Sequence, residues 1–154
     1  MKKLFILFQW AFVIAFGLFA LRMATRLVPP PERHPETWSS WEGFSALSIA
    51  GVSRTATESY VTRDQLTDFL KALQTAGYQT IWPEDALAFL EGRHPLPDKA
   101  VLLIFEGGRK DSYVHTTPVL RQAGAVATLA VPTRLVENWS RFYVRARDLA
   151  RIAR

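Results

Sequence analysis

Cysteine is absent from this sequence of 154 residues, and histidine is scarce, with three residues. The lack of cysteine excludes a disulfide-stapled domain and any zinc or iron–sulfur site with cysteine ligands. Hydrophobic residues make up 49% of the chain, and this share excludes an acidic disordered protein or a low-complexity one. The sequence therefore fits one globular domain of modest size.

The charge is unevenly distributed, although its total of 19 − 14 = +5 is only moderately basic. Residues 1–28 hold four basic residues and no acidic one, and residues 141–154 hold five basic residues against Asp148 alone. Residues 29–140 hold ten basic and thirteen acidic residues, so their net charge is −3. Because the positive charge lies at the two ends, we predict no nucleic-acid partner.

A long apolar run occupies residues 4–21, with Gln9 as its only strongly polar residue. As a helix, these eighteen residues span about 27 Å, which is enough to cross a bilayer core. A cleaved signal peptide is the alternative, but no small-x-small site follows the run. We expect an uncleaved signal anchor within residues 1–28, one transmembrane helix in the cytoplasmic membrane with the remaining chain on the extracytoplasmic side.

A proline-rich linker is expected over residues 29–43, and its start, Pro-Pro-Pro-Glu-Arg-His-Pro, cannot be helical. Trp38 and Trp41 lie in this linker. We expect them to pack onto the following domain; contact with sugar rings or with the membrane interface are the alternatives. The domain itself is predicted over residues 44–154.

Strand-like and helix-like segments alternate through the predicted domain. A Thr62-x-x-Gln65 capping box opens a helix that stops at Gly77, and Pro83 opens another with Leu87 and Leu90 facing inward. This order predicts an α/β fold with a parallel sheet. The expected strands cover residues 44–50, 78–81, 100–105 and 126–131, and the later helices cover residues 112–122 and 147–154.

The chemistry-bearing segment follows residues 100–105, whose unbroken apolar run is typical of a buried parallel strand. We name its continuation, residues 106–111 (Glu-Gly-Gly-Arg-Lys-Asp), the motif loop. Sites in parallel α/β folds form at this end of a strand, so the loop is a candidate ligand or catalytic loop. The alternative is a plain strand-to-helix turn with glycines at the bend, solvated charges and Asp111 as helix N-cap.

Several segments, in order, resemble the polysaccharide deacetylase (NodB-homology) family, carbohydrate esterase family 4. Ile104-Phe-Glu-Gly-Gly108 stands where the family has Thr-Phe-Asp-Asp-Gly. The resemblance implies a distorted (β/α) barrel, divergent and C-terminally incomplete here, since about 110 residues are fewer than the roughly 200 of a closed barrel. The other matching segments are Tyr60–Tyr78, Leu96–Ala100, Pro118–Leu120 and Ala127–Val131.

The family's chemistry suggests roles for the motif loop. In the family a divalent metal, commonly zinc, polarises the acetyl carbonyl and holds the attacking water. The resemblance implies the general-base position at Glu106 and a metal-ligand position at Gly107, which has no side chain. Arg109, Lys110 and Asp111 become candidate ligand-binding residues. The family's later His-x-x-x-His motif is absent, so we predict no metal and no other cofactor.

The histidines do not supply a replacement motif, because His34, His94 and His115 share no i, i+3 or i+4 spacing. The sequence thus predicts a membrane-anchored polysaccharide deacetylase-like protein of cell-envelope glycan metabolism. The family hydrolyses C–N bonds of N-acetyl sugars, and we expect that activity to be impaired or lost here. A non-catalytic glycan- or partner-binding module, and the N-terminal part of a longer protein, are the alternatives.

Overall fold

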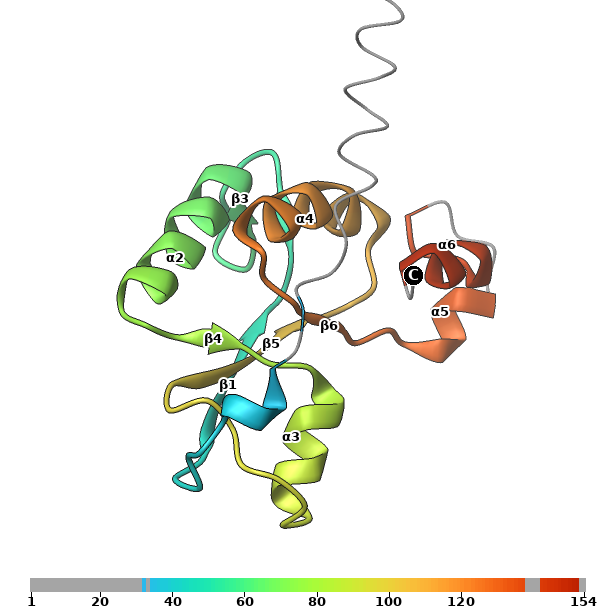
Figure 1. Cartoon of the computed structure of the whole chain (residues 1–154). Helices are drawn as coiled ribbons and strands as arrows, with labels where there is room; N and C mark the ends of the chain where they lie inside the picture. Colours follow the sequence, from blue (N-terminus) through green and yellow to red (C-terminus); the bar gives the residue numbers. More distant parts are fainter. Residues whose placement is uncertain (1–31, 33, 138–141, 153–154) are drawn as a thin grey trace, which may run out of the picture. The chain divides into compact units, whose positions relative to one another are not determined.

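A computed structural model of the chain describes residues 32, 34–137 and 142–152 (Figure 1). The predicted anchor, residues 4–21, lies outside the described residues. Within the described part of the chain, no helix is long and apolar enough to cross a membrane. The elements in order are η1 (Pro35–Thr37), β1 (Phe44–Ile49), β2 (Val52–Ser53), β3 (Val61–Thr62), α2 (Arg63–Thr75), β4 (Gln79–Thr80), α3 (Pro83–Leu90), β5 (Ala100–Phe105), α4 (Lys110–Ala123), β6 (Thr128–Leu129), α5 (Thr133–Glu137) and α6 (Ala146–Ile152).

Strand β5 is the centre of a four-stranded parallel sheet. It pairs with β1 along its whole length, from Phe44 opposite Ala100 to Ile49 opposite Phe105. On its other edge β4 pairs with the start of β5 and β6 with its end. The predicted α/β fold with a parallel sheet is therefore confirmed. A second, two-stranded parallel sheet of β2 and β3 was not predicted, because each of its strands has only two residues.

Helices α2 and α4 pack together over one face of the sheet. The capping box of α2 is present, since Gln65 N donates to Thr62 Oγ1 and Thr62 N donates to Gln65 Oε1. Leu66 and Leu70 on its inner face are buried against Leu103 of β5. The sequence periodicity predicted this helix and its inward face correctly. The buried cluster comprises Val52, Leu66, Leu70, Val101, Leu103, Phe105 and Val119.

Helix α3 packs on a smaller buried cluster near the start of β5, the α3 cluster, which comprises Ile81, Ala86, Leu96 and Ala100. The orientation of the helix differs from the prediction. Leu87 is 53% exposed and Leu90 is 70% exposed, so the expectation that they face inward is wrong. Ala86 and Phe89 face the cluster instead, and Phe89 contacts Trp41 and Phe44 through its ring. A helix of eight residues with apolar groups on two faces cannot be oriented from its own pattern.

The linker residues nearest the domain pack onto it. Trp38 lies against the α3 cluster, and Ser40 forms an antiparallel bridge with Leu96 through bonds of 3.0 and 2.9 Å. The expected packing is thus confirmed for Trp38, whereas Trp41 stacks on Phe89 but is 54% exposed. One 3-10 turn, η1, begins at Pro35, so the expectation that this stretch contains no helical turn is wrong at its last residue. Proline suits the first position of such a turn, where no N–H is required.

Candidate functional site

Glu106 begins the motif loop directly after β5. Its backbone N–H donates to Ile49 O at 3.0 Å, which extends the β1–β5 pairing by one residue. Its carboxylate oxygen Oε1 accepts a hydrogen bond from the hydroxyl of Ser48 on β1. Both side chains are exposed. The predicted base is therefore an open carboxylate at the C-terminal end of the sheet, held by a residue that the sequence reasoning missed.

The two glycines of the motif loop have different surroundings. Gly107 (φ +79°) and Gly108 (φ +59°) both adopt the left-handed conformation that glycine favours. A Cβ added to Gly108 would lie 2.8 Å from Cγ1 of Val131, whereas one added to Gly107 would meet no heavy atom within 4 Å. Gly108 is thus required by packing. Gly107, at the family's metal-ligand position, faces open space.

Arg109 and Asp111 form a two-pronged ion pair within the loop. Arg109 Nε donates to Asp111 Oδ1 at 3.1 Å, and a terminal nitrogen donates to Oδ2 at 2.7 Å. The Arg109 hydrogen bond lowers the pKa of Asp111 below its usual value, and Asp111 raises the pKa of Arg109. The guanidinium also lies 5.8 Å from the ring centre of Tyr60. The structure brings these two predicted ligand-binding residues together, and each neutralises the other.

Asp111 does not cap α4 as the turn interpretation predicted. The helix begins at Lys110, and the N-cap residue is Arg109, which makes no side-chain capping bond. Asp111 sits in the first turn, and its Oδ1 accepts from Ser112 N at 2.9 Å. The helix starts earlier than predicted because a carboxylate in the first turn satisfies a free N–H just as a cap would.

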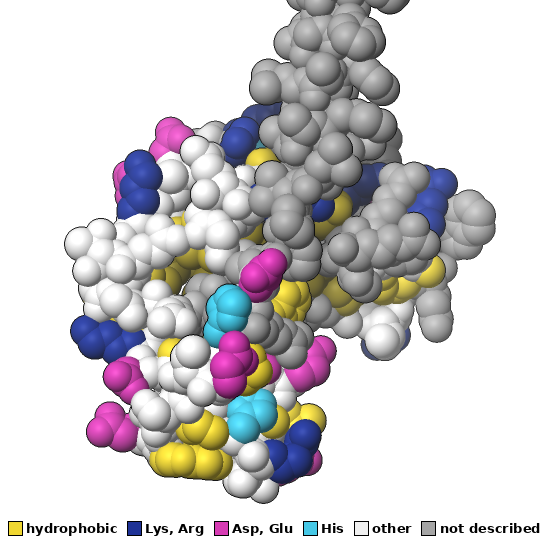
Figure 2. Space-filling view, viewed as in Figure 1, with side chains coloured by type: hydrophobic (Ala, Val, Ile, Leu, Met, Phe, Trp, Pro, Cys, Tyr) yellow, Lys and Arg dark blue, Asp and Glu magenta, His cyan; other side chains and the backbone are white. Residues whose placement is uncertain are grey.

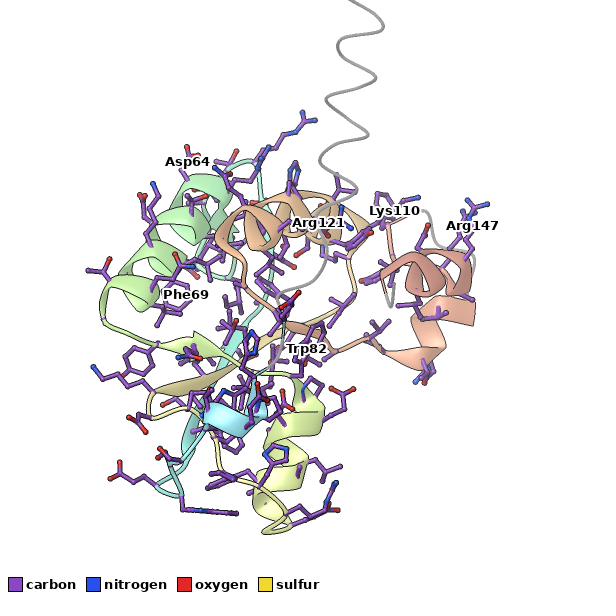
Figure 3. All side chains as sticks on the ribbon, viewed as in Figure 1. Asp64, Phe69, Trp82, Lys110, Arg121 and Arg147 are labelled. Atoms are coloured by element: carbon purple, nitrogen blue, oxygen red, sulfur yellow. The ribbon has the colours of Figure 1, made fainter. Side chains whose placement is uncertain are left out.

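Lys110, the third predicted ligand-binding residue, faces the C-terminal segment at the start of α4 (Figure 3). Its Nζ lies 3.9 Å from the largely buried carboxylate of Asp148, and its backbone N–H donates to Phe142 O at 2.9 Å. Val144 N donates to Gly108 O, also at 2.9 Å. The segment 142–148 therefore holds the motif loop in place. One feature of the sequence could have indicated this segment: Asp148 is the only acidic residue in the basic C-terminal block.

The residues present do not fit the metal that the fold family implies. The predicted metal-ligand position is Gly107, which offers no side-chain donor. Among the described residues, no three His, Cys, Asp or Glu side chains converge. The histidines visible in Figure 2 lie apart from one another. His34 contacts Glu36 at 3.2 Å, and His94 contacts the carbonyl oxygen of Pro95 at 2.8 Å.

Solved structures share this fold. IcaB from Ammonifex degensii matches 72% of this chain with 25% identity and a TM-score of 0.63. The described domain has the polysaccharide deacetylase fold. Streptococcus pyogenes deacetylase PplD, solved with acetate, matches at 21% identity and a TM-score of 0.61. BC0361, a polysaccharide deacetylase from Bacillus cereus, matches at 14% identity and a TM-score of 0.57.

The deacetylase resemblance inferred from the sequence is thus confirmed at the level of the fold. A protein assigned to the polysaccharide deacetylases, YxkH of Bacillus subtilis (strain 168), is 37% identical over 60 residues, which are 39% of this chain and 22% of YxkH. No family profile matches the sequence. The chain spans about half the length of IcaB and PplD, at 48% and 51%, and 36% of BC0361.

Proposed function

We propose that this protein is a membrane-anchored, polysaccharide deacetylase-like protein of cell-envelope glycan metabolism whose hydrolytic activity is impaired. The proposal assigns residues 1–28 to the anchor, 29–43 to the linker and 44–154 to the deacetylase-like domain. The observation that carries it is the motif loop at the end of β5, with an open Glu106 carboxylate beside Gly107. This is the position at which sites form in parallel α/β folds.

The chain's own groups supply one part of an amide hydrolysis. The Glu106 carboxylate, oriented by the Ser48 hydroxyl, can take a proton from a water molecule that attacks an acetyl carbon. Gly107 has no side chain that could ligate the metal that stabilises the developing oxyanion in the family. A positioned base alone contributes about 10²–10⁴-fold, whereas enzymes reach at least about 10⁶-fold. We therefore expect hydrolysis that is slow or undetectable.

The experiment is acetate release from N-acetylglucosamine oligomers by the purified full chain, with added zinc, with and without a chelator. A basal rate at most about 10⁴-fold above the uncatalysed one, unchanged by zinc or chelator, is expected. The matched variant is Glu106→Gln, which removes the base but keeps the size of the side chain. A zinc-dependent turnover that the chelator abolishes would overturn the impaired activity.

A non-catalytic glycan-binding module is the second candidate, because the cations of the motif loop are already paired. Arg109 is held by Asp111, and Lys110 faces Asp148. Cations paired in this way stabilise the loop itself, and they are not positioned to stabilise charge on a reacting substrate. Saturable binding of N-acetylglucosamine oligomers without acetate release would favour this candidate over a slow hydrolase.

The membrane anchor and the extracytoplasmic location are tested separately. In a bacterial host, the full chain fused at its C-terminus to alkaline phosphatase should be active and should remain in carbonate-washed membranes. The same fusion lacking residues 1–28 should be inactive and leave the membrane fraction. A soluble or inactive full-chain fusion would contradict the anchor or the orientation.

A further inference from the structure

A cavity of about 580 Å³ lies at the start of the sheet, away from the motif loop. Its walls come from η1, the end of α2, β4, the start of α3 and the α4–β6 connection. Leu70 forms part of its floor. This volume falls within the range of about 300–1,000 Å³ that is usual for small-molecule sites. We name it the aromatic cavity.

Three aromatic side chains line the aromatic cavity: Trp38, Tyr78 and Trp82. Trp82 directly precedes α3 (Figure 3). Trp38 packs against the α3 cluster and contacts the ring of His94, with ring centres 5.9 Å apart. The faces of aromatic rings carry partial negative charge, so they attract the C–H groups on the flat side of a sugar ring.

Polar groups that suit sugar hydroxyl and amide groups stand between these rings. Thr80 Oγ1 accepts from Val126 N at 2.9 Å, which leaves its hydroxyl proton for another acceptor. Gln74 donates through Nε2 to Ala123 O, so its Oε1 is the acceptor of that amide. Gln79 is exposed at the rim. Aromatic faces with a few placed donors and acceptors give both contact area and orientation.

The charges around the aromatic cavity favour a neutral or cationic ligand over an anionic one. Glu32 and Asp85 line it, and no Lys or Arg stands among its described lining residues. Asp85 is buried, and its Oδ2 accepts from Trp82 N at 3.2 Å. The exposed Glu32 carboxylate would repel phosphate groups and uronic acids.

The aromatic cavity is separate from the motif loop. Its strand β4 pairs with Ala100 and Val101 at the start of β5, whereas Glu106 follows the end of that strand. Six residues of extended chain separate Ala100 from Glu106, a distance of about 20 Å. A ligand in the cavity therefore does not contact the predicted base directly.

From these observations we infer that the aromatic cavity binds one N-acetylhexosamine or hexosamine unit of the glycan chain, at a site distinct from the motif loop. The inference deepens the proposed function and rests on it for the class of glycan. A second contact of this kind would hold a polymer on the protein whether or not hydrolysis occurs.

The test is titration of the full chain with an N-acetylglucosamine tetramer. Tryptophan fluorescence and calorimetry measure the binding. Trp82→Leu and Gln79→Ala should each raise the dissociation constant, about 10-fold or more for Trp82→Leu. Trp41→Ala is the matched tryptophan control, because Trp41 is exposed and stacks on Phe89 outside the cavity. It should leave the dissociation constant unchanged. Thermal melts identify any variant that does not fold, and exposed Gln79 keeps the test valid if Trp82→Leu fails.

Two further arms separate this inference from the proposed function. Binding weakened by Glu106→Gln, but not by either cavity variant, would overturn the cavity and leave the proposed function standing. No binding at all would also overturn the cavity, whatever the acetate assay shows. A galacturonic acid tetramer should bind at least 10-fold more weakly than the N-acetylglucosamine tetramer. Equal affinity for both would contradict the charge argument.

Discussion

The two ends of the parallel sheet differ in how their side chains are used. At the C-terminal end, the charged groups of the motif loop are engaged by other residues: Glu106 by Ser48, Arg109 by Asp111 and Lys110 by Asp148. At the N-terminal end, aromatic rings surround open space with few charges.

The family motif and the open cavity therefore lie at different ends of the sheet. The motif loop has the position of a catalytic loop, but its cations stabilise the loop and the segment 142–148. The aromatic cavity lies outside the motif loop and offers about 580 Å³. The end of a parallel strand is thus a place where a catalytic site can form. Whether catalysis occurs there depends on the side chains present.

Among changes at the motif loop, the largest effect is expected at the glycine turn. Gly108→Ala should destabilise the fold by about 2–4 kcal/mol, because it adds a left-handed backbone cost to a clash with Val131. Gly107→Ala, the matched control, should cost only the backbone part, about 1–2 kcal/mol. Urea denaturation of the full chain measures both. Equal losses of unfolding free energy in the two variants would show that Val131 moves aside and that its contact with position 108 adds no penalty.

The next largest effect is expected where residues 142–148 stabilise the motif loop. Val144 is fully buried, so Val144→Ala should cost about 1–3 kcal/mol and speed amide exchange at Lys110. Phe142→Ala removes an exposed side chain from the same segment and should cost less than about 0.5 kcal/mol. Unchanged Lys110 exchange in Val144→Ala would mean that the loop does not depend on this segment.

A smaller, pH-dependent effect is expected from the Arg109–Asp111 pair. The folded pKa of Asp111 is lowered, so its contribution to stability is present above the unfolded pKa of about 3.9. It is lost as the pH falls through the lower folded value. Both side chains are partly exposed, so the pair contributes less than about 1 kcal/mol at low salt.

Carbon-detected NMR of the Asp111 carboxyl group measures this effect directly. Arg109→Met should move its titration midpoint upward, toward the ordinary aspartate value. The same midpoint in both proteins would refute the pairing.

The smallest effect is expected on α3, near the opposite end of the sheet. Leu90→Gln should change stability by no more than about 0.5 kcal/mol, because Leu90 is exposed. Leu66→Ala on α2 should cost about 2–5 kcal/mol, because Leu66 is buried. A large loss in Leu90→Gln would mean that another surface covers this face of α3.

Local signals predicted much of the fold. The capping box at Thr62 and the apolar spacing of α2 identified that helix, and the unbroken apolar run identified β5 as a buried parallel strand. The orientation of α3 was missed, because a short helix with apolar groups on two faces is oriented by its partners. The two-residue strands β2 and β3 carry no periodic signal at all.

The candidate site was predicted in part. The place of the motif loop followed from the strand before it, but its partners come from distant positions. Ser48 lies 58 residues from Glu106, and Asp148 lies in the last helix. The aromatic cavity draws on three distant stretches, residues 32–38, 70–85 and 124–126, so no single stretch of sequence carries its whole pattern. Such contacts are fixed by the tertiary fold alone.

The central claim is that the motif loop keeps the place of a deacetylase site without its metal-ligand set. Calorimetric titration of the full chain with zinc tests it most directly, with Glu106→Gln as the comparison. We predict no stoichiometric binding that depends on Glu106. One equivalent of zinc bound with submicromolar affinity, and lost in Glu106→Gln, would contradict the account.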